Sequence, residues 1–232
     1  MENSSGKFIT FEGADGVGKS TQVAFVADLL GELGFDVLLV REPGGTKIGE
    51  KVREILLDVD NKEMTDESEL MLYLAARSQI VNEVIIPALD KEKIVLCDRF
   101  FDSTLAYQGF GRGLDKEFIK EANKFVCNGL MPDLTILFYI PAEMRKARLD
   151  KREAADRIES AGREFGERVA DGFLKIADED CNKKRIVKVN TSGKHSQSAL
   201  LTLKALREII DFDVDSQVVK CALDKLDEAH KH

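Results

Sequence analysis

Hydrophobic residues along the chain gather in five short runs that are nearly continuous in apolar character. The runs are rich in β-branched and aromatic residues, and they span Lys7–Glu12, Val37–Val40, Lys93–Cys97, Leu134–Ile140 and Ile186–Val189. Strands that are covered by helices on both faces have this character. The pattern therefore predicts a five-stranded parallel sheet at the centre of a three-layer α/β fold.

The segments between these runs carry apolar residues at helical spacing. They predict helices over about 19–33, 47–58, 67–89, 115–128, 143–180 and 197–211, the fifth with a break. Ala161-Gly162 provides the break, and charges of both signs crowd residues 143–168, so we expect a small mobile lid there. The tail has helical spacing without a chemical motif, and it predicts an accessory helix over about 212–230.

Composition narrows the class of protein. The 232 residues, 44% of them hydrophobic, suit one compact domain over 1–232. A formal net charge of −8 opposes nonspecific attraction to nucleic acid or anionic membranes, and no apolar run approaches the length of a membrane span. Four scattered cysteines and three histidines indicate neither a disulfide framework nor a protein-held zinc site. We expect a cytoplasmic protein without nucleic-acid or membrane partners.

The segment Gly13–Ser20 fits the pattern GxxxxGK[ST], directly after the apolar run Phe8–Phe11 and directly before an amphipathic helix. Glycines let successive N–H groups turn toward phosphate, and the helix N-terminus adds the positive end of its dipole. Lys19 is placed to bridge the outer phosphates of a nucleotide, and the Ser20 hydroxyl to ligate Mg²⁺. The predicted ATP contacts are Gly13, Ala14, Asp15, Gly16, Val17, Gly18, Lys19, Ser20 and Thr21.

Charged residues follow two predicted strands at the carboxyl edge of the sheet, where ligands of open α/β sheets collect. Asp98 follows the run Lys93–Cys97, and it is placed to hold Mg²⁺ directly or through water. Arg99 and Arg41 also fall at strand ends, so both guanidiniums are predicted to converge on a second phosphate. The sequence therefore predicts an enzyme that moves a phosphoryl group from Mg-ATP to a small phosphorylated acceptor.

Small-molecule kinases, GTPases and nucleotide-gated interaction proteins all use such loops. The sequence has no NKxD motif for guanine recognition, because Asn61-Lys62-Glu63-Met64 lacks the acid. It also has no LSGGQ-like segment of the transporter ATPases. These observations disfavour a GTPase.

Five blocks in order give the chain a close resemblance to the thymidylate kinase family over about Lys7–Ile210. The blocks are FEGADGVGKSTQ at 11–22, REPGGT at 41–46, AARSQ at 75–79, DRFFDSTLAYQG at 98–109 and PDLTILFYIP at 132–141. The resemblance implies a P-loop kinase fold and phosphoryl transfer from Mg-ATP to dTMP, which yields dTDP and ADP in dTTP synthesis. It also implies a homodimer.

The resemblance also implies roles for residues on the acceptor side. Arg41 and Arg99 match the arginines that hold and orient the acceptor phosphate. Arg53 resembles a further arginine on the phosphate side. Asp15 matches the acidic residue that receives the 3′-hydroxyl of the sugar.

The same resemblance implies a pocket for the base. Tyr73 stands where the family usually has a phenylalanine that stacks on the base, and Arg77 matches the arginine that reaches a thymine carbonyl. Their i, i+4 spacing places both on one helix face. Thr104 and Gln108 approach the base, while Tyr107 crowds the 2′ position and favours deoxyribose.

The quartet Asp156-Arg157-Ile158-Glu159 is familiar in bacterial members of the family and anchors the lid. Counting back from Asp156 places Arg152 at the catalytic lid arginine and Arg148 at an arginine that lies against adenine. Gly16 lacks the basic catalytic side chain that some members carry at this point of the loop. The resemblance therefore assigns the missing positive charge to Arg152.

Phosphoryl transfer depends mainly on alignment and charge neutralisation, because its transition state is loose. Lys19, Mg²⁺ and Arg152 are predicted to neutralise the moving phosphoryl group, and no general base is required because the acceptor phosphate oxygen is already anionic. Two alternatives stay open at this point. One is a kinase for another nucleotide or nucleoside, because few side chains decide the acceptor. The other is a nucleotide-binding regulator that has lost the transfer activity.

Overall fold

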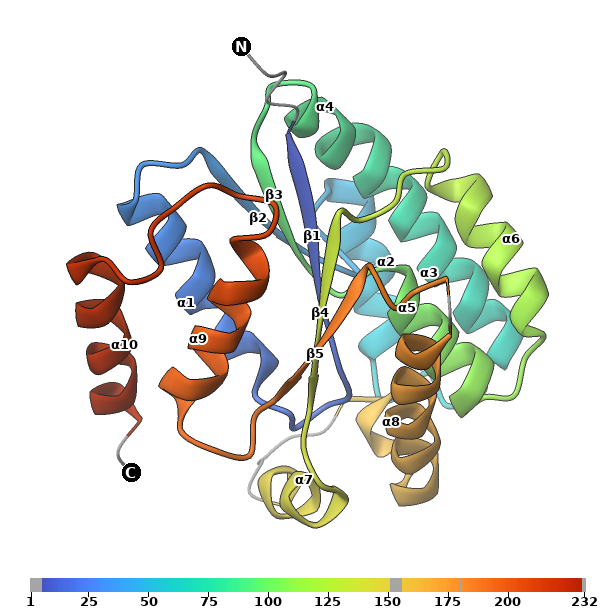
Figure 1. Ribbon diagram of the computed structural model, residues 1–232. Coiled ribbons are helices and arrows are strands. Elements are labelled where there is room, and N and C mark those ends of the chain that lie inside the picture. The colour runs from blue at the N-terminus through green and yellow to red at the C-terminus, as the bar shows by residue number, and fades with distance from the viewer. Residues whose placement is uncertain (1–5, 151–155, 180, 231–232) are drawn as a thin grey trace.

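A computed structural model describes residues 6–150, 156–179 and 181–230. Its strands form one parallel sheet in the order β2-β3-β1-β4-β5 (Figure 1). The strands are β1 Lys7–Glu12, β2 Val37–Arg41, β3 Ile94–Asp98, β4 Leu134–Tyr139 and β5 Ile186–Asn190. The predicted parallel sheet is confirmed, and each strand boundary lies within one residue of its predicted position.

Helices cover both faces of this sheet. They are α1 Lys19–Glu32, α2 Lys47–Leu57, α3 Asp66–Ile80, α4 Ile86–Leu89, α5 Phe101–Thr104, α6 Lys116–Val126, α7 Ala142–Leu149, α8 Arg163–Asp178, α9 His195–Leu206 and α10 Gln217–Ala229. Figure 1 shows α1 and α9 on one face with α10 outside them, and α3, α6 and α8 on the other face. The predicted three-layer architecture is confirmed. None of the helices in the described residues is long and apolar enough to cross a membrane.

The parallel strands bring the predicted functional residues to one edge of the sheet. Phe11 of β1 pairs with Asp98 of β3, and Asp98 also pairs with Arg41 of β2. Gly13 follows β1 directly, so the P-loop starts beside the carboxyl ends of both neighbouring strands. The central position of β1 in the sheet therefore places the phosphate loop between the predicted Mg²⁺ ligand and the lid region.

The predicted interrupted helix over 143–180 contains α7 and α8 among the described residues. A 3-10 turn over Glu159–Ala161 and then Gly162 precede α8. Gly162 has a φ of 97°, a conformation that favours glycine, so the chain changes direction there before α8 begins. Towards the C-terminus, α10 begins after Ser216, whose hydroxyl accepts the N–H of Val219 at 3.4 Å.

One predicted helix differs in detail. The sequence predicts a single helix over 67–89, but a π-helical turn over Val81–Ile85 separates α3 from α4. Pro87 lies in the first turn of α4, and it has no N–H group to continue the α-helical ladder. A proline ring also clashes with the carbonyl four residues earlier in an α-helix, and the wider π turn shifts that carbonyl.

A further helical segment is missing from the predicted elements. The short helix α5 and a π-helical stretch over Leu105–Gly111 follow β3 almost at once. Their N-terminus is capped from a distant strand, because Glu12 Oε1 accepts the N–H groups of Phe100 at 2.8 Å and Ser103 at 3.3 Å. A cap supplied by a residue so far away in sequence leaves no local pattern.

Candidate active site

The P-loop is held between the end of β5 and α7. Gly16 and Gly18 both have a φ of 84°, in the left-handed region where a side chain is strained. Thr191, directly after β5, donates its hydroxyl to the Val17 carbonyl at 2.6 Å. Arg148 of α7 donates to the Thr191 carbonyl at 2.9 Å. The predicted adenine-side arginine therefore lies against the loop region.

Lys19 lies buried in the first turn of α1, where its ammonium group forms an ion pair with Asp98. Burial and the nearby positive charge of Arg99 lower the pKa of Lys19, although Asp98 acts in the opposite direction. Ser20, the next residue, is exposed. The residues predicted to meet the outer phosphates and Mg²⁺ are thus together, and the charges of the lysine and the aspartate are paired.

A cavity of about 240 Å³ opens from these residues across the carboxyl edge of the sheet. Most of the side chains that the sequence singles out line it: Asp15, Lys19, Ser20, Arg41, Arg53, Tyr73, Arg77, Asp98, Arg99, Thr104, Tyr107 and Gln108. Gly13, Ala14, Gly16, Val17, Gly18 and Thr21 belong to the loop and its helix and are not among its lining residues. Arg152 falls within 151–155 and lies outside the described residues.

Two arginines converge at one end of this cavity. Arg41 and Arg53 both donate to the Pro43 carbonyl, over 3.1 Å and 3.0 Å. Burial and the neighbouring positive charge of Arg41 lower the pKa of Arg53. Arg41 also pairs with Glu50 at 3.0 Å, and both side chains of this pair are partly exposed. Such pairs contribute only about 0–1 kcal/mol, so an anionic ligand can compete with Glu50 for Arg41.

Arg99 lies between the P-loop and the same cavity. Its guanidinium donates to Asp15 at 2.6 Å and to the Gly13 carbonyl at 2.9 Å, and it lies over the ring of Tyr107. The Tyr107 hydroxyl donates to the other Asp15 oxygen at 2.5 Å. Burial raises the pKa of Tyr107, so its hydroxyl stays protonated and remains a donor. Asp15 is therefore oriented from two sides.

Arg77 projects from α3 into a buried polar network. Its Nε donates to Glu42 at 2.7 Å, and its Nη1 donates to Thr104 at 2.5 Å and to Asn123 at 2.7 Å. Its Nη2 lies 2.5 Å from Glu42. A guanidinium has five N–H groups, and these partners engage four of them, while Arg77 also lines the cavity.

Gln108 and Tyr73 also line this cavity. The Gln108 amide donates to Glu69 at 2.7 Å, and Glu69 also pairs with Arg112 at 2.8 Å and Arg157 at 2.7 Å. Burial would raise the pKa of Glu69, but the hydrogen bonds from Arg112 and Gln108 outweigh it and hold the pKa below its usual value. Burial raises the pKa of Tyr73, so its ring carries a neutral hydroxyl.

Three buried acids support the site without having been singled out as site residues. Glu42 fixes Arg77, Glu69 fixes Gln108, and Glu12 accepts the Ser103 hydroxyl at 2.5 Å. Burial, together with the charge of Asp102, raises the pKa of Glu12 to about 7. Glu12 lies in the block 11–22 and Glu42 in the block 41–46, two of the five blocks that carry the family resemblance. Their position in these blocks is the one sequence signal that points to them.

Comparison with known proteins decides the family. The family model described as thymidylate kinase matches residues 11–200. The chain belongs to the thymidylate kinase family. A thymidylate kinase from Desulforudis audaxviator is 49% identical over 197 residues, which cover 84% of this chain and 89% of that protein. One from Pseudomonas fluorescens is 49% identical over 176 residues, covering 76% of this chain and 84% of that protein.

A solved thymidylate kinase shares the fold. The crystal structure of the enzyme from Ehrlichia chaffeensis matches with a TM-score of 0.72 and 34% sequence identity. The match covers 87% of this chain and 99% of that one. The residues matched by the thymidylate kinase family model include the P-loop, the cavity-lining side chains and α7, whereas α10 lies beyond them.

Proposed function

We propose that the chain transfers the γ-phosphoryl group of Mg-ATP to dTMP, yielding dTDP and ADP for dTTP synthesis. One observation carries the proposal. A single cavity is lined by the P-loop lysine and Asp98 and also by Tyr73 and Arg77. Such a cavity brings a nucleotide's outer phosphate within reach of the phosphate of a second nucleotide. Membership in the thymidylate kinase family supports dTMP as that second nucleotide.

Phosphate positioning falls to the charged side chains of this cavity. Arg41, Arg53 and Arg99 hold the acceptor phosphate, because their guanidiniums suit bidentate contact with phosphate oxygens. When ATP binds, the Lys19 ammonium group leaves Asp98 and pairs with the outer phosphates of the nucleotide. An acceptor phosphate oxygen then attacks the γ-phosphorus, and the bond to the bridging oxygen of ADP breaks with its electron pair.

Mg²⁺ fits the residues at the end of the P-loop. Ser20 offers an exposed hydroxyl and Asp98 a carboxylate that is 22% exposed, and both line the same cavity. A magnesium ion in such sites takes one or two protein oxygens, together with phosphate and water oxygens. When bound, it neutralises charge on the nucleotide phosphates. Ser20 and Asp98 are therefore proposed as its ligands.

Recognition of deoxythymidine rests on side chains from α3 and the segment after β3. Tyr73 stacks on the base, Arg77 gives its remaining N–H to a thymine carbonyl, and Thr104 and Gln108 lie alongside the base. Tyr107 is held against Asp15 by its hydroxyl, so its ring is fixed where it can crowd a 2′-hydroxyl. Asp15 receives the 3′-hydroxyl.

The acceptor panel tests the function. Initial rates of ADP formation from Mg-ATP are measured with dTMP, dUMP, dCMP and thymidine at equal concentrations. We expect dTMP to give the highest kcat/KM and thymidine to give no turnover, because thymidine lacks the phosphate that the arginines hold. Preference for another acceptor would favour the alternative of a different nucleotide or nucleoside kinase. ADP release that is independent of every acceptor would favour a nucleotide-binding protein without transfer.

The lid and the ATP side complete the proposed assignment. Arg148 is proposed to lie against adenine, and Arg152 to act from the lid region of residues 143–168. We also propose that residues 1–232 form one cytoplasmic kinase domain, with α10 as an accessory helix.

A homodimer is proposed through the outer side of α6. Phe118 and Phe125 stand seven residues apart on this helix, on one side of it, and they are 51% and 82% exposed. Met71 on α3, the helix beside α6, is 47% exposed. Exposed apolar side chains that gather on one surface mark an association site.

We expect the wild-type chain to sediment with twice the mass of one chain. The double variant Phe118→Glu and Phe125→Glu should sediment as a monomer, because the interface would then bury the new negative charges of both chains against each other. Val218→Glu, at a partly exposed apolar residue of α10, serves as the control and should leave the dimer intact. A double variant that remains dimeric would place the interface on another surface.

A further inference from the structure

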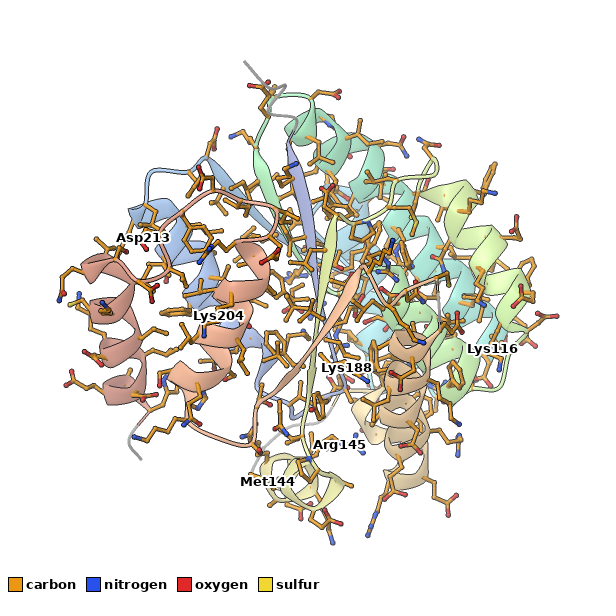
Figure 2. The ribbon with its side chains drawn as sticks, viewed as in Figure 1. Lys116, Met144, Arg145, Lys188, Lys204 and Asp213 are labelled. Carbon is orange, nitrogen blue, oxygen red and sulfur yellow. The ribbon has the colours of Figure 1, made fainter. Side chains whose placement is uncertain are left out.

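The C-terminal helix α10 packs firmly on the kinase fold, although it lies beyond the residues that the family model matches. That match ends at residue 200, within α9. Val219 and Leu226 of α10 are buried, and the helix contacts α9 and α1. In Figure 2, Asp213, which precedes α10, lies far from Met144 of α7, and α10 runs from there toward the end of the molecule that carries α7. The last turn of α10 therefore lies at the same end as the P-loop.

This last turn supplies a cap for the N-terminus of α9. The N–H groups in the first turn of a helix have no acceptor within the helix. Asp227 Oδ1 accepts the N–H of Ser196 at 2.9 Å, and Asp227 Oδ2 accepts the Ser196 hydroxyl at 2.7 Å. The helix dipole favours a carboxylate at this end of a helix. The same hydrogen bonds hold the pKa of Asp227 below its usual value, so the cap is ionised at neutral pH.

Two histidine rings make a second contact between the same two turns. The rings of His195 and His230 stack with their centroids 4.4 Å apart. His230 Nδ1 lies 2.9 Å from the Leu226 carbonyl, which can only accept, so this nitrogen carries the proton and the ring is fixed on α10. Burial and the neighbouring His230 and Arg148 lower the pKa of His195, so its ring is neutral at pH 7. The end of α10 is thus joined to the start of α9 by a cap and by a ring contact.

The start of α9 is in turn joined to the helix that follows the P-loop. Gln22 of α1 is buried and comes one residue after Thr21, a proposed ATP contact. Its amide donates to the His195 carbonyl at 3.1 Å and to the Ser198 hydroxyl at 3.0 Å. A shift of the first turn of α9 would therefore disturb the first turns of α1.

The short loop between β5 and α9 makes the connection to the P-loop itself. Thr191 holds the Val17 carbonyl, and Arg148 holds the Thr191 carbonyl. Arg148 Nη1 would stand 3.3 Å from a Cβ atom added at Gly18, so this arginine lies directly beside the loop. Only three residues separate Thr191 from His195. The position of the α9 N-terminus consequently affects both the P-loop and the proposed adenine-side arginine.

We propose that Asp227 is a positioning residue for ATP, which holds the first turn of α9 and thereby keeps the P-loop and Arg148 in the arrangement that binds the nucleotide. The inference rests on the proposed function, since it concerns the ATP of the same reaction. The described residues that line the acceptor cavity include none from α9 or α10. Asp227 therefore acts on ATP and not on dTMP.

Asp227→Ala tests this role, because alanine preserves the helix and removes both hydrogen bonds to Ser196. Dissociation constants of the full chain for ATP, ADP and dTMP are measured by titration calorimetry. We expect those for ATP and ADP to rise by about fivefold or more, because the lost hydrogen bonds have an ionised acceptor, and that for dTMP to stay within about twofold. Asp224→Ala removes an exposed aspartate from the same helix and should bind all three as the wild type does.

Two further variants separate positioning from general support of the fold. Ser196→Ala removes the other partner of the cap, so adding it to Asp227→Ala should weaken ATP binding little further in a double-mutant cycle. Asp227→Glu keeps the carboxylate and should recover part of the affinity for ATP. If Asp227→Ala does not fold, Ser196→Ala alone is measured by the same criteria.

The outcomes separate this role from the proposed function, because ATP binding is measured without turnover. A wild-type chain that does not phosphorylate dTMP overturns the proposed function. A wild-type chain that does so, together with an Asp227→Ala variant that binds ATP within about twofold of it, overturns the role of Asp227. Weakening of ATP and dTMP binding by equal factors would also overturn it, and would show that Asp227 supports the fold as a whole.

Discussion

Lys19→Ala is expected to lower kcat by about 10³ or more and to change dTMP binding little. Lys19 is buried in the first turn of α1, at the mouth of the phosphate loop, and its ammonium group faces Asp98. The charge that it brings to the outer phosphates is needed most when negative charge spreads in the transition state. No other cation occupies the same position in the described part of the P-loop, which runs from Gly13 to Ser20. Single-turnover rates with saturating ATP and dTMP measure the effect directly.

The dissociation constant of dTMP, measured by titration calorimetry, checks the second half of this prediction. Lys204→Ala is the matched control, because it removes an exposed lysine from α9, and its kcat should equal that of the wild type. Thermal unfolding of both variants shows whether the fold is intact. A Lys19→Ala variant with near-wild-type turnover would contradict the assignment of the P-loop as the ATP site.

Arg99→Ala is expected to lower kcat/KM for dTMP by about 10³, because the acceptor phosphate loses a bidentate partner and its alignment with the γ-phosphorus. Arg99 also orients Asp15 at 2.6 Å, so contact with the sugar weakens in the same variant. Steady-state kinetics with dTMP as the varied substrate measure this loss.

Arg99→Gly distinguishes the effect of losing the Arg99 guanidinium from the effect of backbone strain at this position. Arg99 has a φ of 72°, which costs an alanine about 1 kcal/mol relative to glycine. We therefore expect Arg99→Gly to be more stable than Arg99→Ala by about that amount in urea unfolding, and equally inactive. Activity that returns in Arg99→Gly would show that backbone conformation at this position, rather than the guanidinium, governs transfer.

The sequence predicts the sheet and the phosphate loop well, because both leave local patterns. Continuous apolar runs mark buried parallel strands, and glycines at fixed spacing before Lys19 mark the loop. The helical segment after β3 leaves no such pattern. Its N-terminus depends on the Glu12 carboxylate from β1, and that contact exists only after β1 and β3 pair.

In the candidate site, too, some features can be predicted from local sequence patterns and others depend on contacts between distant segments. Arg41, Arg99 and Asp98 follow from strand ends, because parallel strands bring their carboxyl ends together. The partners of Arg77 do not follow, because Glu42, Thr104 and Asn123 come from three separate segments.

The central claim is direct transfer of the γ-phosphoryl group between two nucleotides in one cavity. ATP labelled at the γ-phosphorus is incubated with the full chain, Mg²⁺ and dTMP, and the labelled products are separated by chromatography. We predict that the label appears in dTDP, with one ADP formed for each dTDP and little label in inorganic phosphate. Label that accumulates in inorganic phosphate while dTMP stays unchanged would contradict the claim.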